Sequence, residues 1–270
     1  MKTTRLLSLI FGFSIALQSH AILITFDEAT DYTSLFNATD SDALSWSSAN
    51  GVGGTSGRVG VPQSTATSDT TAVYNQTSFD LTTGDTFETS IYFLIPDPIG
   101  GNAFITAAQI GFTSENNQGF LNNSGFAYIS SRVRANATGD TYILESQFKN
   151  PTDGATNVDT TGTFNLSVDN WYKLTATYTD VGSSFDYTAT VQNFGTDGIT
   201  TGSVVESISG NMAQTSLSGT DTTAWAAFRS NGHVSENKVL ALDNFAVIPE
   251  PGTLVILGFA LTTLAVFRRR

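Results

Sequence analysis

Asp243 has the most unusual surroundings of any ionisable residue in this sequence. It lies within Val239–Val247, where the residues at alternate positions on either side of it are apolar. A carboxylate buried in an apolar strand has to accept hydrogen bonds or bind a metal ion. Two interpretations follow: Asp243 hydrogen-bonds the backbone at a bulge or strand end, or it ligates a cation.

Residues for catalysis are scarce. The histidines are His20 and His233, and the chain has no cysteine, so neither a catalytic triad nor a zinc site of histidines or thiolates can be assembled. Glycoside hydrolysis requires two carboxylates at a fixed separation. Glu88, Glu145 and Glu206 each stand alone in their predicted strands, and motifs typical of polysaccharide lyases are missing. The sequence predicts no catalytic residue and a protein that is not an enzyme.

Three aromatic residues could form platforms for a sugar ring: Trp46, Tyr128 and Trp225. Each could equally pack in the interior, where most large aromatic side chains lie. No residue pattern identifies a sugar, so the sugar-binding residues are unknown at this point.

The charge balance is strongly acidic. Between Ile22 and Ile248 the chain has 23 acidic and 7 basic residues, a balance of −16, whereas the whole chain has −12. Such a surface repels phosphate backbones and anionic lipid. Nucleic acid is therefore not an expected partner, and cations are more natural ligands.

The elements that would position these residues are strands. Trp171–Asp180 and Ser184–Val191 alternate apolar and polar residues with period two, and the turn between them predicts a hairpin. Further strands are predicted over Ile22–Phe26, Phe87–Ile95, Phe104–Phe112, Phe126–Arg134, Thr141–Phe148, Ser203–Ser209, Thr223–Arg229 and Val239–Val247. Ala49–Thr71, rich in Gly, Ser and Thr, is expected to be a long surface excursion.

Many short strands separated by polar turns predict an all-β, two-sheet antiparallel β-sandwich of the jelly-roll type. Three segments resemble those of laminin-G-like and concanavalin-like sandwiches: Ile24–Glu28 their first strand, Asp169–Leu174 a strand entry, and Leu242–Val247 their closing strand. The resemblance spans residues 22–248, which we expect to form one domain.

The same resemblance implies a structural calcium ion. In related carbohydrate-binding jelly rolls, an acidic residue of the first strand and one near the last strand hold calcium, which here would be Asp27 or Glu28 with Asp243. Calcium prefers hard oxygen ligands such as these. No other cofactor is expected.

Residues 1–21 are typical of a signal peptide. Lys2 and Arg5 precede the apolar run Leu6–Leu17, and signal peptidase would cleave between Ala21 and Ile22. The alternative is a retained N-terminal anchor, for which the apolar run is short.

Residues 249–270 are typical of a second targeting segment, at the C-terminus. Pro249, Glu250 and Pro251 precede the apolar stretch Thr253–Phe267, expected to be a short transmembrane helix, and Arg268, Arg269 and Arg270 follow it. This order resembles the PEP-CTERM sorting signal, which implies recognition by an exosortase, an integral-membrane transpeptidase, and cleavage near Pro-Glu-Pro. The alternative is an ordinary stop-transfer anchor.

The resemblance implies export across the inner membrane of a Gram-negative bacterium, with transient insertion by the C-terminal helix, and delivery to the outer surface or an extracellular biofilm matrix. The sequence therefore predicts a structural or adhesive protein that can contact exopolysaccharide. A lectin-like carbohydrate-binding module is the alternative, and a polysaccharide hydrolase or lyase is less favoured because catalytic residues are missing.

Overall fold

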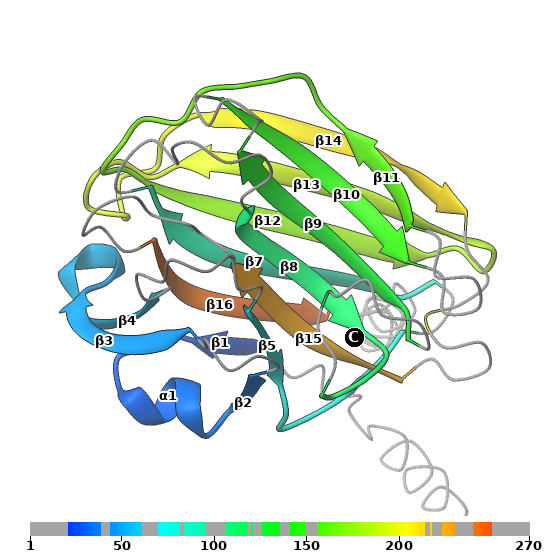
Figure 1. Cartoon of the computed structure of the whole chain (residues 1–270). Helices are drawn as coiled ribbons and strands as arrows, with labels where there is room; N and C mark the ends of the chain where they lie inside the picture. Colours follow the sequence, from blue (N-terminus) through cyan, green and yellow to red (C-terminus); the bar gives the residue numbers. More distant parts are fainter. Residues whose placement is uncertain are drawn as a thin grey trace, which may run out of the picture.

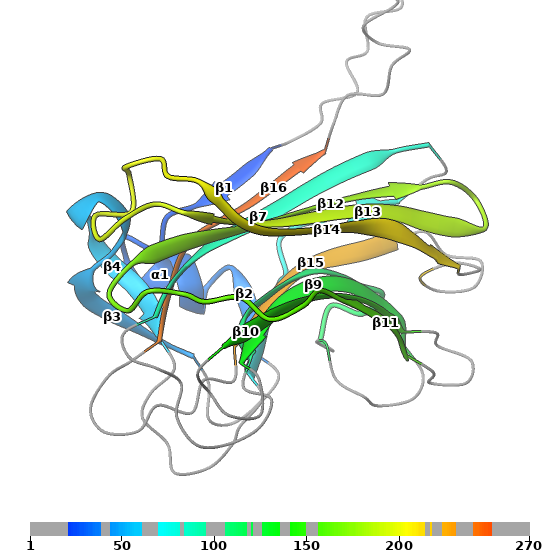
Figure 2. The same cartoon turned by 90° about the horizontal axis from the view of Figure 1, so that it is seen from above.

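Two antiparallel β-sheets lie face to face in the described part of the chain (Figure 1, Figure 2). The computed structural model describes residues 21–38, 44–60, 70–81, 84–95, 106–117, 120, 126–135, 141–149, 156–213, 217, 223–230 and 240–249. The predicted all-β, two-sheet antiparallel sandwich is confirmed.

The first sheet, sheet A, is one layer of the sandwich. Its strands in spatial order are β14 (Val204–Ala213), β13 (Ser184–Asn193), β12 (Trp171–Asp180), β7 (Thr86–Leu94), β16 (Ala241–Pro249), β4 (Ser56–Gly60) and β3 (Ser45–Asn50), and β1 (Ile22–Ile24) also pairs with β16.

The second sheet, sheet B, is the opposite layer. Its order is β11 (Thr156–Thr160), β10 (Tyr142–Lys149), β9 (Tyr128–Ala135), β8 (Thr106–Thr113), β15 (Thr223–Ser230), β5 (Thr70–Tyr74) and β2 (Phe36–Ala38), and β6 (Phe79–Asp80) also pairs with β15. A short helix, α1 (Ala29–Thr33), and a 3-10 turn, η1 (Val52–Gly54), join strands near the N-terminus.

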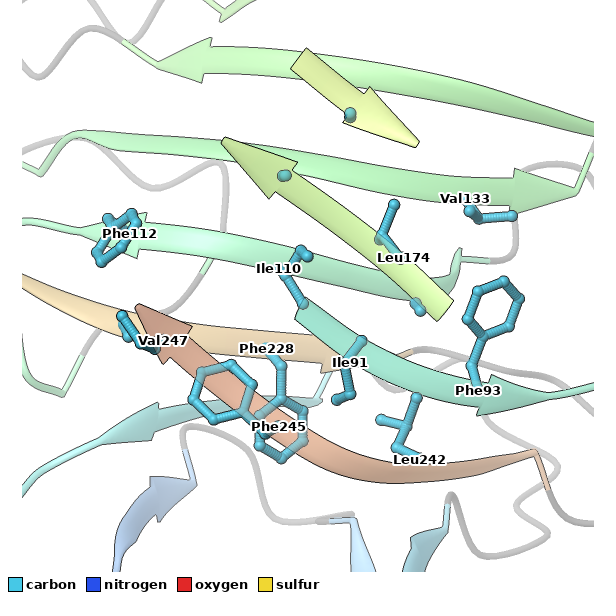
Figure 3. Packing of buried hydrophobic residues seen from close by; sticks show 14 of the residues in the cluster. Ile91, Phe93, Ile110, Phe112, Val133, Leu174, Phe228, Leu242, Phe245 and Val247 are labelled. Carbon is cyan, nitrogen blue, oxygen red and sulfur yellow. The ribbon is translucent and has the colours of Figure 1, made fainter. Parts of the chain in front are cut away.

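The main core lies between the sheets, because alternate side chains of each strand point inward. Figure 3 shows Phe228 of sheet B beside Phe245 of sheet A, with Ile91, Phe93, Leu174 and Leu242 around them. The Phe228 and Phe245 ring centroids are 5.3 Å apart. Burial of this apolar area is the main force that holds the two sheets together.

The predicted strands exist with ends shifted by a few residues. The Trp171–Asp180 strand has the predicted bounds, and its partner continues two residues further, to Asn193. Ala176 lies opposite Ala189 across this hairpin, with both side chains in the core as the alternation predicted.

The expectation of a surface excursion over Ala49–Thr71 is wrong where the structure describes this segment. Ser56–Gly60 forms β4, which pairs with both β3 and β16. A Cβ on Gly57 would lie 2.2 Å from the Phe26 carbonyl oxygen, so the backbones approach as closely as glycine alone allows. Backbone pairing, not apolar content, makes this segment a strand.

The predicted signal peptide and the predicted C-terminal sorting signal lie largely outside the described residues. Residues 1–20, Glu250, Pro251 and Arg268–Arg270 are not described, whereas Ala21 precedes β1 and Pro249 is the last residue of β16. Among the described residues, no helix is long and apolar enough to cross a membrane. The signal peptide and the sorting signal therefore stay predictions.

Candidate functional site

The outer face of sheet B, on the side away from the core, carries an unusual set of polar residues. On β9, Ile129 and Val133 point into the core, so Tyr128, Ser130, Arg132 and Arg134 point outward. The same alternation places Glu145, Gln147 and Lys149 of β10, and Trp225 and Arg229 of β15, on the outer face. The strand register therefore gathers charged side chains from three strands.

The pairing of the strands aligns the charged residues in one transverse row. Arg229 lies opposite Gln109 of β8, Gln109 opposite Arg132, and Arg132 opposite Glu145. We call these four residues, with Arg134 and Lys149, the basic face. Four of the seven basic residues between Ile22 and Ile248 belong to it, although the domain as a whole is acidic.

Glu145 joins two of the cations. Arg132 Nε donates to Glu145 Oε2 at 2.5 Å and Arg134 Nη2 donates to Oε1 at 2.5 Å. Glu145 is 1% exposed, whereas the two arginine side chains retain 17% and 18%. With its amide oxygen turned toward Arg132, Gln147 accepts from Arg132 Nη2 at 2.7 Å. Both arginine side chains are thus held in place by Glu145 and remain partly exposed.

Lys149 and Arg229 lie deeper. The Lys149 ammonium is 3.9 Å from the centre of the Phe126 ring, a cation–π contact, and burial lowers the pKa of Lys149. Arg229 Nη1 donates to the Phe120 carbonyl at 2.8 Å. Phe120 packs on Tyr128, with ring centroids 5.5 Å apart. Aromatic groups therefore cover the inner part of the basic face and leave Arg132 and Arg134 at its accessible end.

Two further features give the face a neutral polar character. Gln109 is fully buried; its Nε2 donates to Ser130 Oγ at 2.8 Å, and its Oε1 has no hydrogen-bond partner among the described residues. Burial raises the pKa of Tyr128, although the charges of Arg132 and Arg229 oppose this rise. The Tyr128 phenol is therefore protonated at neutral pH and can donate a hydrogen bond.

Sequence reasoning missed this site because it weighed the charge of the whole segment and considered Glu145 alone. The signal was nevertheless present: Arg132 and Arg134, and Glu145 and Gln147, stand at alternate positions of two consecutive predicted strands, and Lys149 directly follows the second. Alternate residues of a strand share a face. Arg229 could not be added, because its register against Gln109 joins strands that are far apart in sequence.

Asp243 lies at a bulge of β16 that faces β7. Its Oδ2 accepts the Val52 N–H at 2.7 Å and its Oδ1 accepts the Asn244 N–H at 2.7 Å. The pKa of Asp243 is raised to about 7: burial raises it most, the two backbone hydrogen bonds lower it, the Asp27 charge raises it and the Arg58 charge lowers it. The backbone-bonded interpretation of Asp243 therefore describes what the structure contains.

The other two predicted calcium ligands lie in different surroundings. Asp27 Oδ2 accepts from Thr25 Oγ1 at 2.7 Å, and Asp27 is near enough to Asp243 to influence its pKa. Glu28 is exposed and caps α1 together with Asp31. No cluster of three or more His, Cys, Asp or Glu side chains occurs among the described residues. Calcium at Asp27 and Asp243 therefore stays a prediction.

The three aromatic residues considered for sugar binding lie in different surroundings. Trp46 Nε1 donates to the Phe26 carbonyl at 2.7 Å, and its ring packs against the main core. Tyr128 is 2% exposed, whereas Trp225 is partly exposed beside the same outer cluster. Trp225 is thus the candidate that could contact a sugar ring on this face. His233 lies outside the described residues.

No protein-family model matches the chain, and no curated protein is similar to it in sequence. Solved structures are similar in fold. An alginate lyase from a Chlorella virus has a TM-score of 0.51 at 11% identity, covering 85% of this chain and 99% of that one. A carbohydrate esterase from the Shiga toxin-encoding bacteriophage phi24B has 0.50 at 13%, covering 85% and 98%.

Lectin II from Ulex europaeus has a TM-score of 0.48 at 11% identity, covering 86% of this chain and 99% of the lectin. At identities this low, the lyase and the esterase show a common β-sandwich fold and leave the activity of this chain open.

Proposed function

We propose that this protein is an exported carbohydrate-binding protein of the cell surface or extracellular matrix, and that the basic face of sheet B holds an acidic polysaccharide. One observation carries the proposal: four of the seven basic residues between Ile22 and Ile248 converge on one sheet face of an otherwise acidic domain. An anionic chain would be repelled by most of the surface and attracted here.

The chemistry of the face suits carboxylate groups on sugars. A guanidinium fork binds a carboxylate through two parallel hydrogen bonds, and Arg132 and Arg134 each keep part of the side chain exposed. Trp225, partly exposed on the same sheet face, offers an aromatic surface for a sugar ring. The fold that this chain shares with an alginate lyase and a carbohydrate esterase also supports a carbohydrate ligand.

The surroundings of Glu145 and Tyr128, the two groups of this face considered for proton transfer, favour binding over catalysis. Glu145 is held between two arginines, which occupy both of its carboxylate oxygens. Tyr128 has a raised pKa, so it is a poor base at neutral pH. We therefore propose an adhesive or structural role without catalysis.

Delivery is the other part of the proposal. Signal peptidase would release the N-terminal segment, and an exosortase would process the Pro-Glu-Pro segment. Pro249 ends β16, so Glu250 and Pro251 follow directly after the folded body. A processing enzyme could then reach this peptide without unfolding the sandwich.

Binding of purified protein to polygalacturonate and alginate, with neutral dextran for comparison, tests the ligand by titration calorimetry. We expect Arg134→Gln to weaken uronate binding about tenfold, because a charge-assisted hydrogen bond contributes on the order of 1.5 kcal/mol. Glu145→Gln should strengthen it, because both guanidinium groups lose a competing carboxylate.

Lys173→Gln is the matched control, because it removes one positive charge from the outer face of sheet A. It should leave uronate binding unchanged. Equal losses from Arg134→Gln and Lys173→Gln, or tighter binding of dextran than of uronates, would contradict the proposed site.

A further inference from the structure

The first and last described strands meet at one edge of the sandwich. β1 pairs antiparallel with the end of β16, with Ile22 opposite Val247 and Leu23 opposite Ala246. Figure 2 shows the start of β1 and the end of β16 side by side at this edge. The segments that precede Ile22 and follow Pro249 in the sequence therefore leave the folded body from neighbouring points.

This edge is apolar. Leu23 is 67% exposed and Ile248 is 41% exposed, and the register places both on the same face of sheet A. Beside them lies a recess of about 560 Å³ without a charged side chain in its lining, which consists of Ile22, Leu23, Ile24, Leu35, Tyr74, Gln76 and Thr77 and of Ala21, which the predicted cleavage would remove. We call Leu23, Ile248 and this lining the apolar rim.

The sequence fixes how far this rim can be from a membrane. The predicted membrane segment starts at Thr253, four residues after the end of β16. Four residues span at most about 14 Å when fully extended. The headgroup layer on each side of a bilayer is about 6 Å thick. The end of β16 therefore has to lie within or just above the headgroups while Thr253–Phe267 is inserted.

We infer that the apolar rim rests on the phospholipid surface while the chain is anchored by its C-terminal segment, so that the sandwich stands on the membrane in one orientation. The inference rests on the anchoring step of the proposed function. Exposed leucine and isoleucine side chains favour the interfacial region. Glu88 lies opposite Ile248 on the same face, whereas the amino group that the predicted cleavage would leave on Ile22 is attracted to anionic lipid. The short tether supplies a high effective concentration, so weak contacts suffice.

The absence of cysteine from the chain allows a direct test. Single cysteines at Leu23 and Ile248, and at Val204 and Val158 as exposed apolar controls away from the rim, would carry an environment-sensitive fluorophore. The chain from Ile22 to Arg270 would be reconstituted in vesicles of phosphatidylethanolamine with a minority of phosphatidylglycerol. We expect blue-shifted emission and several-fold stronger quenching by spin-labelled lipid at the rim than at the controls.

Replacing Leu23→Asp in the Ile248→Cys protein should reduce that quenching toward the control level, because a carboxylate opposes entry into the interface. Val204→Asp in the same protein should have no effect. Chains that float with the vesicles but show equal quenching at all four positions would overturn this inference alone. Chains that do not float with vesicles would overturn the anchoring proposal together with it.

Discussion

Asp243 shows how much of a residue's behaviour depends on its immediate partners. Its carboxylate is fully buried, and it is held by the backbone N–H groups of Val52 and Asn244 and faced by Asp27 and Arg58. A Cβ on Gly51 would collide with Asp243 Oδ2, so the turn at Gly51 is built around this carboxylate. The sequence identified Asp243 as unusual, but the partner at Val52 comes from a segment 191 residues away.

The raised pKa of Asp243, about 7, makes stability depend on pH. Because the folded state holds the proton more tightly than the unfolded state, the stabilisation is fully present below about pH 4 and is lost as pH rises to about 7. With a metal chelator present, we expect the unfolding temperature to fall as the pH is raised from about 4 to about 7. The Asp243→Asn variant should not show this fall.

The same measurement of unfolding temperature against pH tests the predicted calcium site. An ion bound by Asp27 and Asp243 would favour the ionised carboxylates, so added calcium should raise the unfolding temperature near pH 8 and reverse the trend. An unfolding temperature near pH 8 that does not respond to calcium would exclude the predicted site. A pH dependence equal in the native chain and in Asp243→Asn would exclude Asp243 as its source.

At the scale of elements, the strands with clear alternation could be predicted and the strands held by their neighbours could not. The hairpin of β12 and β13 has its own apolar period and turn, so local sequence determined its bounds. β4 contains two glycines and one charged residue in five positions, and pairing with β3 and β16 defines it. The order of strands in sheet B, which creates the basic face, depends on long-range register that no local pattern contains.

Gly111 allows β8 to lie close to β9, and this close pairing sets the register of the strands that carry the basic face. It has a φ of 156°, and a Cβ there would lie 2.1 Å from the Ile129 carbonyl oxygen and 2.6 Å from Ser130 Cα. We expect Gly111→Ala to push β8 away from β9 and to lower the unfolding free energy by about 2 kcal/mol or more in chemical denaturation.

Gly84→Ala is the matched control for that substitution. Gly84 also has a positive φ, 93°, but nothing lies within 4 Å of its added Cβ. The difference between the two variants therefore measures the steric clash, separated from backbone strain. Equal losses would mean that close packing of β8 on β9 does not require a glycine at Gly111.

At the scale of the whole molecule, the charges oppose one another. The balance of −16 between Ile22 and Ile248 surrounds a basic face whose four cations exceed its bound carboxylate, Glu145. A polyanion approaching from far away meets net repulsion, whereas one in contact with the basic face meets attraction. Which of the two dominates depends on the distance over which the solvent transmits charge.

Salt should therefore change uronate binding in both directions. The Debye length is about 30 Å at 0.01 M, where the whole acidic surface repels the polymer, and about 8 Å at 0.15 M, where the local cations dominate. At 1 M it falls to about 3 Å, and the attraction is screened as well. We expect the affinity for polygalacturonate to rise, pass through a maximum near physiological salt and then fall, as measured by calorimetry across this range. A steady fall from the lowest salt would mean that the remaining surface does not repel the polymer, and dextran, which has no charge, should show no maximum.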